Sequence, residues 1–204
     1  LPRITEELNG VARSLKLIQR LKEIAIREQN DSIANAILDV EKQGSFNQFL
    51  TICLLDVLSI YKNSISAIHL WDELFSLRQG YLLIYEALKT YSLHSKSLKE
   101  LTLNTTPEVI ATFTDLSVEI REFKRKFDYE GEISDFRNNI IGHIEIDPIS
   151  FFNKLSKFDT DKAFAALKSF PLLLASMLNF STIIFKTYTS DIIKNSVRTC
   201  RSQC

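Results

Sequence analysis

Apolar residues recur every three or four positions along almost the whole chain, and this spacing predicts amphipathic α-helices. In residues 6–29 the pattern places the following side chains on one face: Leu8, Val11, Leu15, Ile18 and Leu21. A polar break at 30–32 and a glycine at Gly44 interrupt the same period further along. We therefore expect separate helices over 6–29, 33–43 and 46–62.

The middle of the chain predicts two further helices separated by a polar stretch. After a turn at 63–64, the apolar spacing continues over about 66–93. Residues 95–106 are polar, so we expect a loop with one helical turn there, and this loop is the best candidate for a domain boundary. Thr106-Pro107-Glu108 then starts a helix that ends near Phe127, with Thr as N-cap, Pro in the first position and an acid in the first turn.

The last third of the chain predicts two short helices and one long one. A break at 128–131 precedes a helix over 132–144, and a second short helix is expected over 148–158. Thr160-Asp161 is expected to cap the final helix, which runs over 162–197. No strand, internal repeat or low-complexity segment is evident in the sequence.

The predicted fold is an all-α, up-and-down helical bundle. The composition agrees, because the chain has only 5 Gly and 4 Pro in 204 residues, and all-β folds and Gly-rich nucleotide loops need more glycine. We expect a single domain over 1–204. In the alternative, the N-terminal helices at 5–62 form an appendage to it.

Charge and cysteine content narrow the functions to be considered. Lys+Arg and Asp+Glu balance at 25 each, so the chain has no overall field to attract nucleic acid, although a local basic patch stays open. Cys53, Cys200 and Cys204 suit neither a disulfide framework nor a zinc site. We expect a reducing, cytoplasmic location, with no metal or other cofactor.

The longest uncharged run, Ser169–Phe185, predicts a core helix and not a membrane span. It is shorter than the ~20 residues that cross a bilayer, and it contains Ser176 and Asn179. We therefore expect no membrane association. Pro171 lies within this helix and predicts a kink, because proline removes a backbone donor and clashes with the preceding turn.

The segment with the most reactive side chains is Arg137-Asn138-Asn139-Ile140-Ile141-Gly142-His143. At 100° per residue, an apolar stripe contains Ile133, Phe136, Ile140 and Ile144, and Arg137 and His143 lie about 60° to either side of it. Asn139 is on the side of His143, whereas Asn138 points away from the stripe. Arg137 and His143 are about 9 Å apart along the axis. Two copies packed across a two-fold axis would bring both to one phosphate, which predicts a homodimer.

The sequence Phe-Arg-Asn-Asn-Ile-Ile-Gly-His-Ile-Glu-Ile-Asp at 136–147 resembles the Arg-Asn-x4-His signature of the HEPN superfamily (higher eukaryotes and prokaryotes nucleotide-binding). Outside that window only the all-α pattern agrees. The resemblance implies a HEPN-type bundle with extra helices that acts as a metal-independent RNA endonuclease, with a site shared by two subunits. It also implies a toxin or phage-defence protein, with a cognate antitoxin or nucleotidyltransferase as its partner.

The resemblance further implies a role for each motif residue. His143 would act as general base or acid on the ribose 2′-OH and the leaving oxygen, because imidazole titrates near neutral pH. Arg137 would stabilise charge on the phosphate, and Asn138 would orient the other groups or the substrate. The products would be 2′,3′-cyclic phosphate and 5′-hydroxyl ends. Asn139, beside His143, is a candidate for substrate binding.

A basic face upstream is the second candidate for RNA binding. Arg121, Lys124 and Arg125 share one helix face at spacings of three and four residues. The alternative is a solvated surface, because Glu119 and Glu122 dilute the positive charge. His69 and His94 have no partner at metal-ligand spacing, and we expect them on a helix surface or at an interface.

Two non-catalytic functions remain open beside the nuclease. The chain would be a HEPN-like module that binds a nucleotide, an RNA or a protein, or a helical scaffold without a site. In the scaffold, Arg137 would extend along the apolar surface towards water and His143 would cap its own helix.

Overall fold

The computed structural model describes residues 13, 16, 19, 20, 22, 23, 27, 31–138, 153 and 155–202, with only the backbone described at 31–36 and 191–202. This part of the chain is almost entirely helical and contains no strand, which confirms the all-α prediction. In chain order the elements are α2 (Asp31–Ile65), α3 (Leu70–Leu103), α4 (Pro107–Lys126), the π-helical η1 (Tyr129–Ile133), α5 (Ser134–Phe136) and α7 (Thr160–Ser202).

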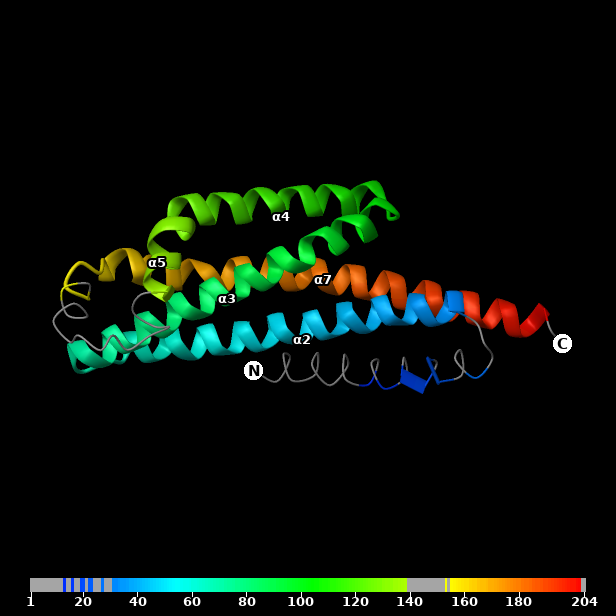
Figure 1. Ribbon diagram of the computed structural model, residues 1–204, viewed down its shortest axis with the longest axis horizontal. Helices are drawn as coiled ribbons and strands as arrows, with labels where there is room; N and C mark the ends of the chain where they lie inside the picture. The colour runs from blue at the N-terminus through cyan, green and yellow to red at the C-terminus, as the bar shows by residue number, and fades with distance from the viewer. Residues whose placement is uncertain are drawn as a thin grey trace.

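The long helices form a bundle in which consecutive members run in opposite directions (Figure 1). α2 packs most extensively against α7, and α3 packs against both of them. α4 packs against α3 and α7, on the side away from α2 (Figure 1). η1 and α5 follow α4 and return the chain to the end of the bundle where α3 and α7 begin.

The predicted break at Gly44 is wrong, because α2 is continuous from Asp31 to Ile65. Gly44 is buried in the middle of the helix, and Val40, Phe46 and Leu50 on either side are almost completely buried. A helical glycine costs about 1 kcal/mol relative to alanine, which the burial of one large apolar side chain offsets. The turn expected at 63–64 lies instead between Ile65 and Leu70.

The loop predicted at 95–106 is wrong over 95–103, and the chain leaves the helix only at 104–106. α3 continues to Leu103, and Leu98 and Thr102 on its inner face are buried. The Thr102 hydroxyl donates to the Leu98 carbonyl at 2.6 Å, so its polar group is satisfied within the helix. The phenol of Tyr188 on α7 donates to the Leu101 carbonyl at 2.8 Å, which ties this end of α3 to the bundle.

The helix start at 106–108 is confirmed, and α7 begins at Thr160, two residues earlier than predicted. Thr106 is extended at the N-cap of α4 and Pro107 is its first residue. For α7 the capping side chain is Asp159, and not Thr160-Asp161, since its carboxylate accepts from the Lys162 backbone N–H at 2.9 Å. α7 continues through Pro171 to Ser202.

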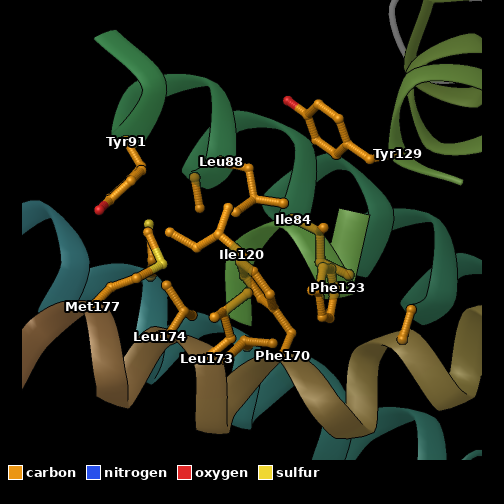
Figure 2. Close-up of a cluster of buried hydrophobic side chains, with 14 of the residues drawn as sticks. Ile84, Leu88, Tyr91, Ile120, Phe123, Tyr129, Phe170, Leu173, Leu174 and Met177 are labelled. Carbon is orange, nitrogen blue, oxygen red and sulfur yellow. The ribbon is translucent and has the colours of Figure 1, made fainter. Parts of the chain in front are cut away.

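One continuous apolar core joins the helices, and Figure 2 shows the part of it that lies between α3, α4 and α7. α3 and α7 approach closely at Gly80, because a Cβ there would lie 2.8 Å from Leu167 Cδ1. The apolar stripe predicted for the motif helix is confirmed at its two described positions, since Ile133 is fully buried and Phe136 nearly so. Ile140 and Ile144 lie outside the described residues.

Among the described residues, two helical segments are long and apolar enough to cross a membrane by length and composition: Ile37–Ile65 and Thr160–Ser190. About 39% and 44% of their most apolar windows are buried within the bundle. These segments belong to α2 and α7, which are core helices and the most extensively packed pair. Core helices of soluble proteins pass the same test, so the absence of membrane association stays a prediction.

Truncation of Leu167 should destabilise the bundle strongly, because Leu167 is fully buried against Gly80. We expect Leu167→Ala to lower the free energy of unfolding by about 2–5 kcal/mol through lost burial and a residual cavity. The matched control is Leu172→Ala on the same helix, where the side chain is 76% exposed; it should change stability by less than about 0.5 kcal/mol. Urea unfolding followed by circular dichroism measures both, and equal effects would contradict the packing described.

Candidate functional site

An unusual turn after α4 sets the direction in which the motif leaves the bundle. Asp128 adopts a left-handed backbone conformation with φ of 49°, and its carboxylate accepts from the Glu132 N–H at 3.2 Å. A Cβ on Gly131 would lie 2.6 Å from that carboxylate, so glycine is needed to keep the cap. The Ile133 N–H then bonds the Asp128 carbonyl at 3.2 Å, which is the spacing of a π-turn. Such turns are frequent at functional sites.

Aromatic packing holds the next residues against α3. Phe136 stacks on Phe158 at 4.3 Å between ring centroids, and it lies perpendicular to the Tyr81 ring at 5.6 Å. Tyr81 also donates its hydroxyl to Glu132 at 3.0 Å, and Glu132 pairs with Lys162 at the start of α7. These contacts fix the backbone immediately before Arg137.

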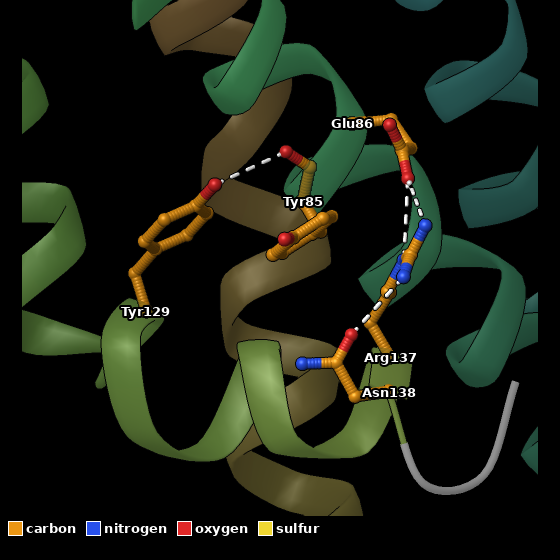
Figure 3. Close-up of polar contacts among 5 residues, drawn as sticks. All are labelled: Tyr85, Glu86, Tyr129, Arg137 and Asn138. Atoms are coloured by element: carbon orange, nitrogen blue, oxygen red, sulfur yellow. Dashed lines mark hydrogen bonds and ion pairs between the residues drawn. The ribbon is translucent and has the colours of Figure 1, made fainter. Parts of the chain in front are cut away.

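Arg137 is bound to α3 by a forked contact with Glu86 (Figure 3). Its Nε and Nη2 both donate to Glu86 Oε1, at 3.3 and 3.1 Å, and its Nη1 donates to Asn138 Oδ1 at 3.0 Å. The Arg137 and Glu86 side chains are 34% and 40% exposed. The pair is therefore half-buried and still open to solvent.

Two stacked tyrosines support the guanidinium from one side (Figure 3). The Arg137 guanidinium carbon lies 5.2 Å from the centre of the Tyr85 ring, a cation–π arrangement. Tyr129 stacks on Tyr85 at 5.7 Å with an interplanar angle of 15°, and its hydroxyl donates to the Tyr85 carbonyl at 3.2 Å. Burial, followed by the nearby Tyr85 and glutamates, raises the pKa of Tyr129, so it stays a neutral hydrogen-bond donor.

The contacts of Arg137 leave two of its guanidinium N–H groups available to a ligand. A guanidinium has five N–H groups, and the three bonds to Glu86 and Asn138 use one on each nitrogen. Within the described part of the chain, one N–H on Nη1 and one on Nη2 have no acceptor. Donors on both terminal nitrogens suit the bidentate binding of a phosphate or carboxylate oxygen pair.

The structure brings together part of the predicted catalytic set. Arg137 and Asn138 are in direct contact, and Asn138 is otherwise exposed. Its amide oxygen therefore helps to orient Arg137, and the role of Asn138 in catalysis stays a prediction. Asn139 and His143 lie outside the described residues, so the placement of His143 beside Arg137 stays a prediction.

The predicted basic face of α4 divides into different environments. Lys124 lies 4.3 Å from the centre of the Tyr129 ring and 3.6 Å from Glu130. Arg121 is exposed and donates from Nε to the Ser117 carbonyl at 3.2 Å, and Arg125 is exposed. Lys124 is thus joined through the stacked tyrosines to Arg137, whereas Arg121 and Arg125 extend along the outer face of α4.

Sequence reasoning did not find Glu86, Tyr85 and Tyr129. Arg137 and Glu86 are 51 residues apart, so no local spacing connects them. One signal was available: Glu86 is the only charged residue between Arg78 and Lys89 in an otherwise uncharged stretch of α3. An isolated acid in such a stretch usually has a specific partner.

The other two histidines lie apart from this site. His69 is exposed at the N-cap of α3, as expected for a surface residue. His94 is half-buried and stacks on Phe46 at 4.4 Å, in a groove of about 410 Å³ between α2 and α3 that Glu41 and Lys42 also line. Burial lowers the pKa of His94 below its ordinary value.

The lowered pKa of His94 predicts that stability falls in acid. The unfolded chain takes up this proton more readily than the folded one, so stability is fullest above pH ~6.5 and declines as the pH falls through the folded pKa. His94→Gln should remove this component, giving a shallower decline in the free energy of unfolding from pH ~7.5 to ~5. His69→Gln is the exposed control and should retain the wild-type slope, and a wild-type slope in His94→Gln would contradict the prediction.

Comparison of the chain with protein-family models, with curated protein sequences and with solved structures finds no match. Among the described residues, no three His, Cys, Asp or Glu side chains are placed to hold a metal ion. The structure establishes an all-α bundle in which Arg137, directly after η1 and α5, is half-buried and paired with Glu86.

Proposed function

We propose that the chain is a metal-independent RNA endonuclease of HEPN type. The observation that carries the proposal is Arg137, which is the first residue of the Arg-Asn-x4-His motif and is held with two N–H groups directed to no acceptor among the described residues. A phosphodiester offers two non-bridging oxygens that match donors of this kind. The all-α bundle also agrees with the family.

The proposed reaction is an internal transesterification. His143 removes the proton from the ribose 2′-OH, and the 2′ oxygen attacks the adjacent phosphorus. The bond to the 5′ oxygen breaks, that oxygen takes up a proton from a protonated His143, and a 2′,3′-cyclic phosphate and a 5′-hydroxyl remain. Arg137 stabilises the charge that accumulates on the non-bridging oxygens, and the amide of Asn138 keeps its guanidinium in place.

A second copy of the chain would complete the site. On a regular helix Arg137 and His143 are about 9 Å apart along the axis and lie on either side of the apolar stripe, so one copy does not easily bring both to one phosphate. A two-fold axis along that stripe presents each residue twice. This arrangement supports a homodimer as the active form.

A second candidate function is a binding module without turnover. The Arg137–Glu86 pair favours it, because the guanidinium already has a carboxylate partner and its positive charge is partly neutralised. In this case the same donors bind a phosphate of a nucleotide or RNA, or a carboxylate of a protein. Arg137→Ala would then weaken binding, and no cleavage would occur in the wild-type protein.

The nuclease proposal predicts cleavage of RNA in the presence of EDTA. His143→Ala and Arg137→Ala should each lower the rate by at least about 100-fold, because each removes a group that acts on the reacting atoms. Gel electrophoresis of several single-stranded and structured RNAs measures the rate, and mass spectrometry identifies cyclic phosphate ends. The matched controls are His69→Ala and Lys99→Ala, both at exposed positions; they should cleave at the wild-type rate. Intact RNA with every substrate would contradict the proposal.

The shared site predicts a stable dimer in solution. Light scattering coupled to size-exclusion chromatography should give twice the chain mass at the concentrations used for the cleavage assay. Specific activity should fall on dilution below the dissociation constant of the dimer, since a monomer has only half of each site. A strict monomer that retains full activity would contradict the shared site without contradicting the nuclease chemistry.

A further inference from the structure

We propose that Glu86 is a positioning residue for Arg137 and that it also limits the affinity of the site for phosphate. This inference rests on the proposed function, because it concerns the same arginine. Glu86 belongs to α3, outside the motif, and reaches Arg137 across 51 residues of sequence. Its two roles depend on different properties of the carboxylate, so they can be separated.

The positioning role depends on one oxygen atom. Arg137 Nε and Nη2 both donate to Glu86 Oε1, and only N–H groups on the same side of the guanidinium can share one acceptor. The remaining N–H on Nη2 therefore points away from Glu86, towards the end of the guanidinium. Asn138 engages Nη1, and the Tyr85 ring covers one face. Contacts on three sides fix the plane and the rotation of the group.

The limiting role depends on the negative charge. A carboxylate 3.1 Å from Nη2 neutralises part of the charge that would attract a phosphate. With 34% of Arg137 and 40% of Glu86 exposed, solvent weakens this effect without removing it. Glu86 thus holds the arginine in a productive orientation and lowers the affinity of that arginine for any oxyanion.

Two substitutions separate the roles. In Glu86→Gln the amide oxygen can accept the same two bonds at one atom, and the charge is lost. In Glu86→Ala both the acceptor and the charge are lost. Glu100→Gln is the matched control, because it removes the same charge from an exposed position of α3, 14 residues further along and about 21 Å away along the axis.

Nuclear magnetic resonance of the arginine Nε–Hε groups in the full chain tests positioning without requiring catalysis. The Arg137 signal is assigned by its loss in Arg137→Lys. We expect slow exchange of this Hε with water in the wild type, Glu86→Gln and Glu100→Gln, because a hydrogen-bonded N–H is protected. We expect fast exchange in Glu86→Ala. Equal protection in Glu86→Ala, or loss of protection in Glu86→Gln, would overturn the positioning role.

Titration with inorganic phosphate, followed by the same signal, tests the limiting role. Glu86→Gln should bind phosphate about two- to fivefold more tightly than the wild type, the size expected for removal of one half-exposed charge. Glu100→Gln should match the wild type. An unchanged or weaker affinity in Glu86→Gln would overturn this role, as would an Arg137 signal that phosphate does not shift in any variant.

Cleavage assays with the same variants distinguish failure of this inference from failure of the proposed function. If RNA is cleaved, Glu86→Gln should lower KM with little change in kcat, whereas Glu86→Ala should lower kcat. A uniform loss in both variants would overturn the inference and leave the nuclease standing. If RNA is intact with the wild type, the nuclease fails, and the exchange and phosphate measurements still decide the role of Glu86.

Discussion

The geometry of the site around Arg137 depends on the contacts of the buried Tyr81 side chain. Its ring makes edge-to-face contacts with Phe136 and Phe158, and its hydroxyl donates to Glu132, so one residue of α3 joins the turn after α4 to the segment just before α7. Burial, with Glu132 as the next cause, raises the pKa of Tyr81, which keeps it a neutral donor. A charged phenolate here would be buried and would face the Glu132 carboxylate.

The site lies one helical turn further along α3. Residues four apart share a helix face, so Tyr85 lies on the same face of α3 as Tyr81, one turn further along. Glu86 is the next residue of α3. Consecutive helical residues point about 100° apart, and the Arg137 guanidinium therefore lies between the Tyr85 ring and the Glu86 carboxylate. Tyr81 and the residues that contact Arg137 occupy adjacent turns of one helix. The packing around Tyr81 therefore also fixes the position of Tyr85 and Glu86, which orient the Arg137 guanidinium.

Sequence periodicity predicted the features that depend on neighbours within a helix. It gave the all-α class, the start at Thr106 and the inward faces of Ile133 and Phe136. It failed where long-range packing decides, as at Gly44 and over 95–106, since burial against other helices offsets a local preference for a break. Sequence periodicity could not predict the contact between Glu86 and Arg137 for the same reason, because the two residues meet only when the segment after α4 packs against α3.

The charge balance of the chain gives this arrangement a physical rationale. With no overall positive field, the RNA substrate of the proposed nuclease would not be drawn to the protein from a distance, and Glu86 neutralises part of the charge of Arg137. Preference for the transition state over the substrate must then come from the geometry of the contacts. The transition state of the proposed cleavage carries more charge on the non-bridging oxygens than the substrate does, so oriented donors with moderate affinity favour it over the bound substrate. A site of this kind binds the substrate less tightly, and it keeps the difference in affinity between transition state and substrate on which catalysis depends.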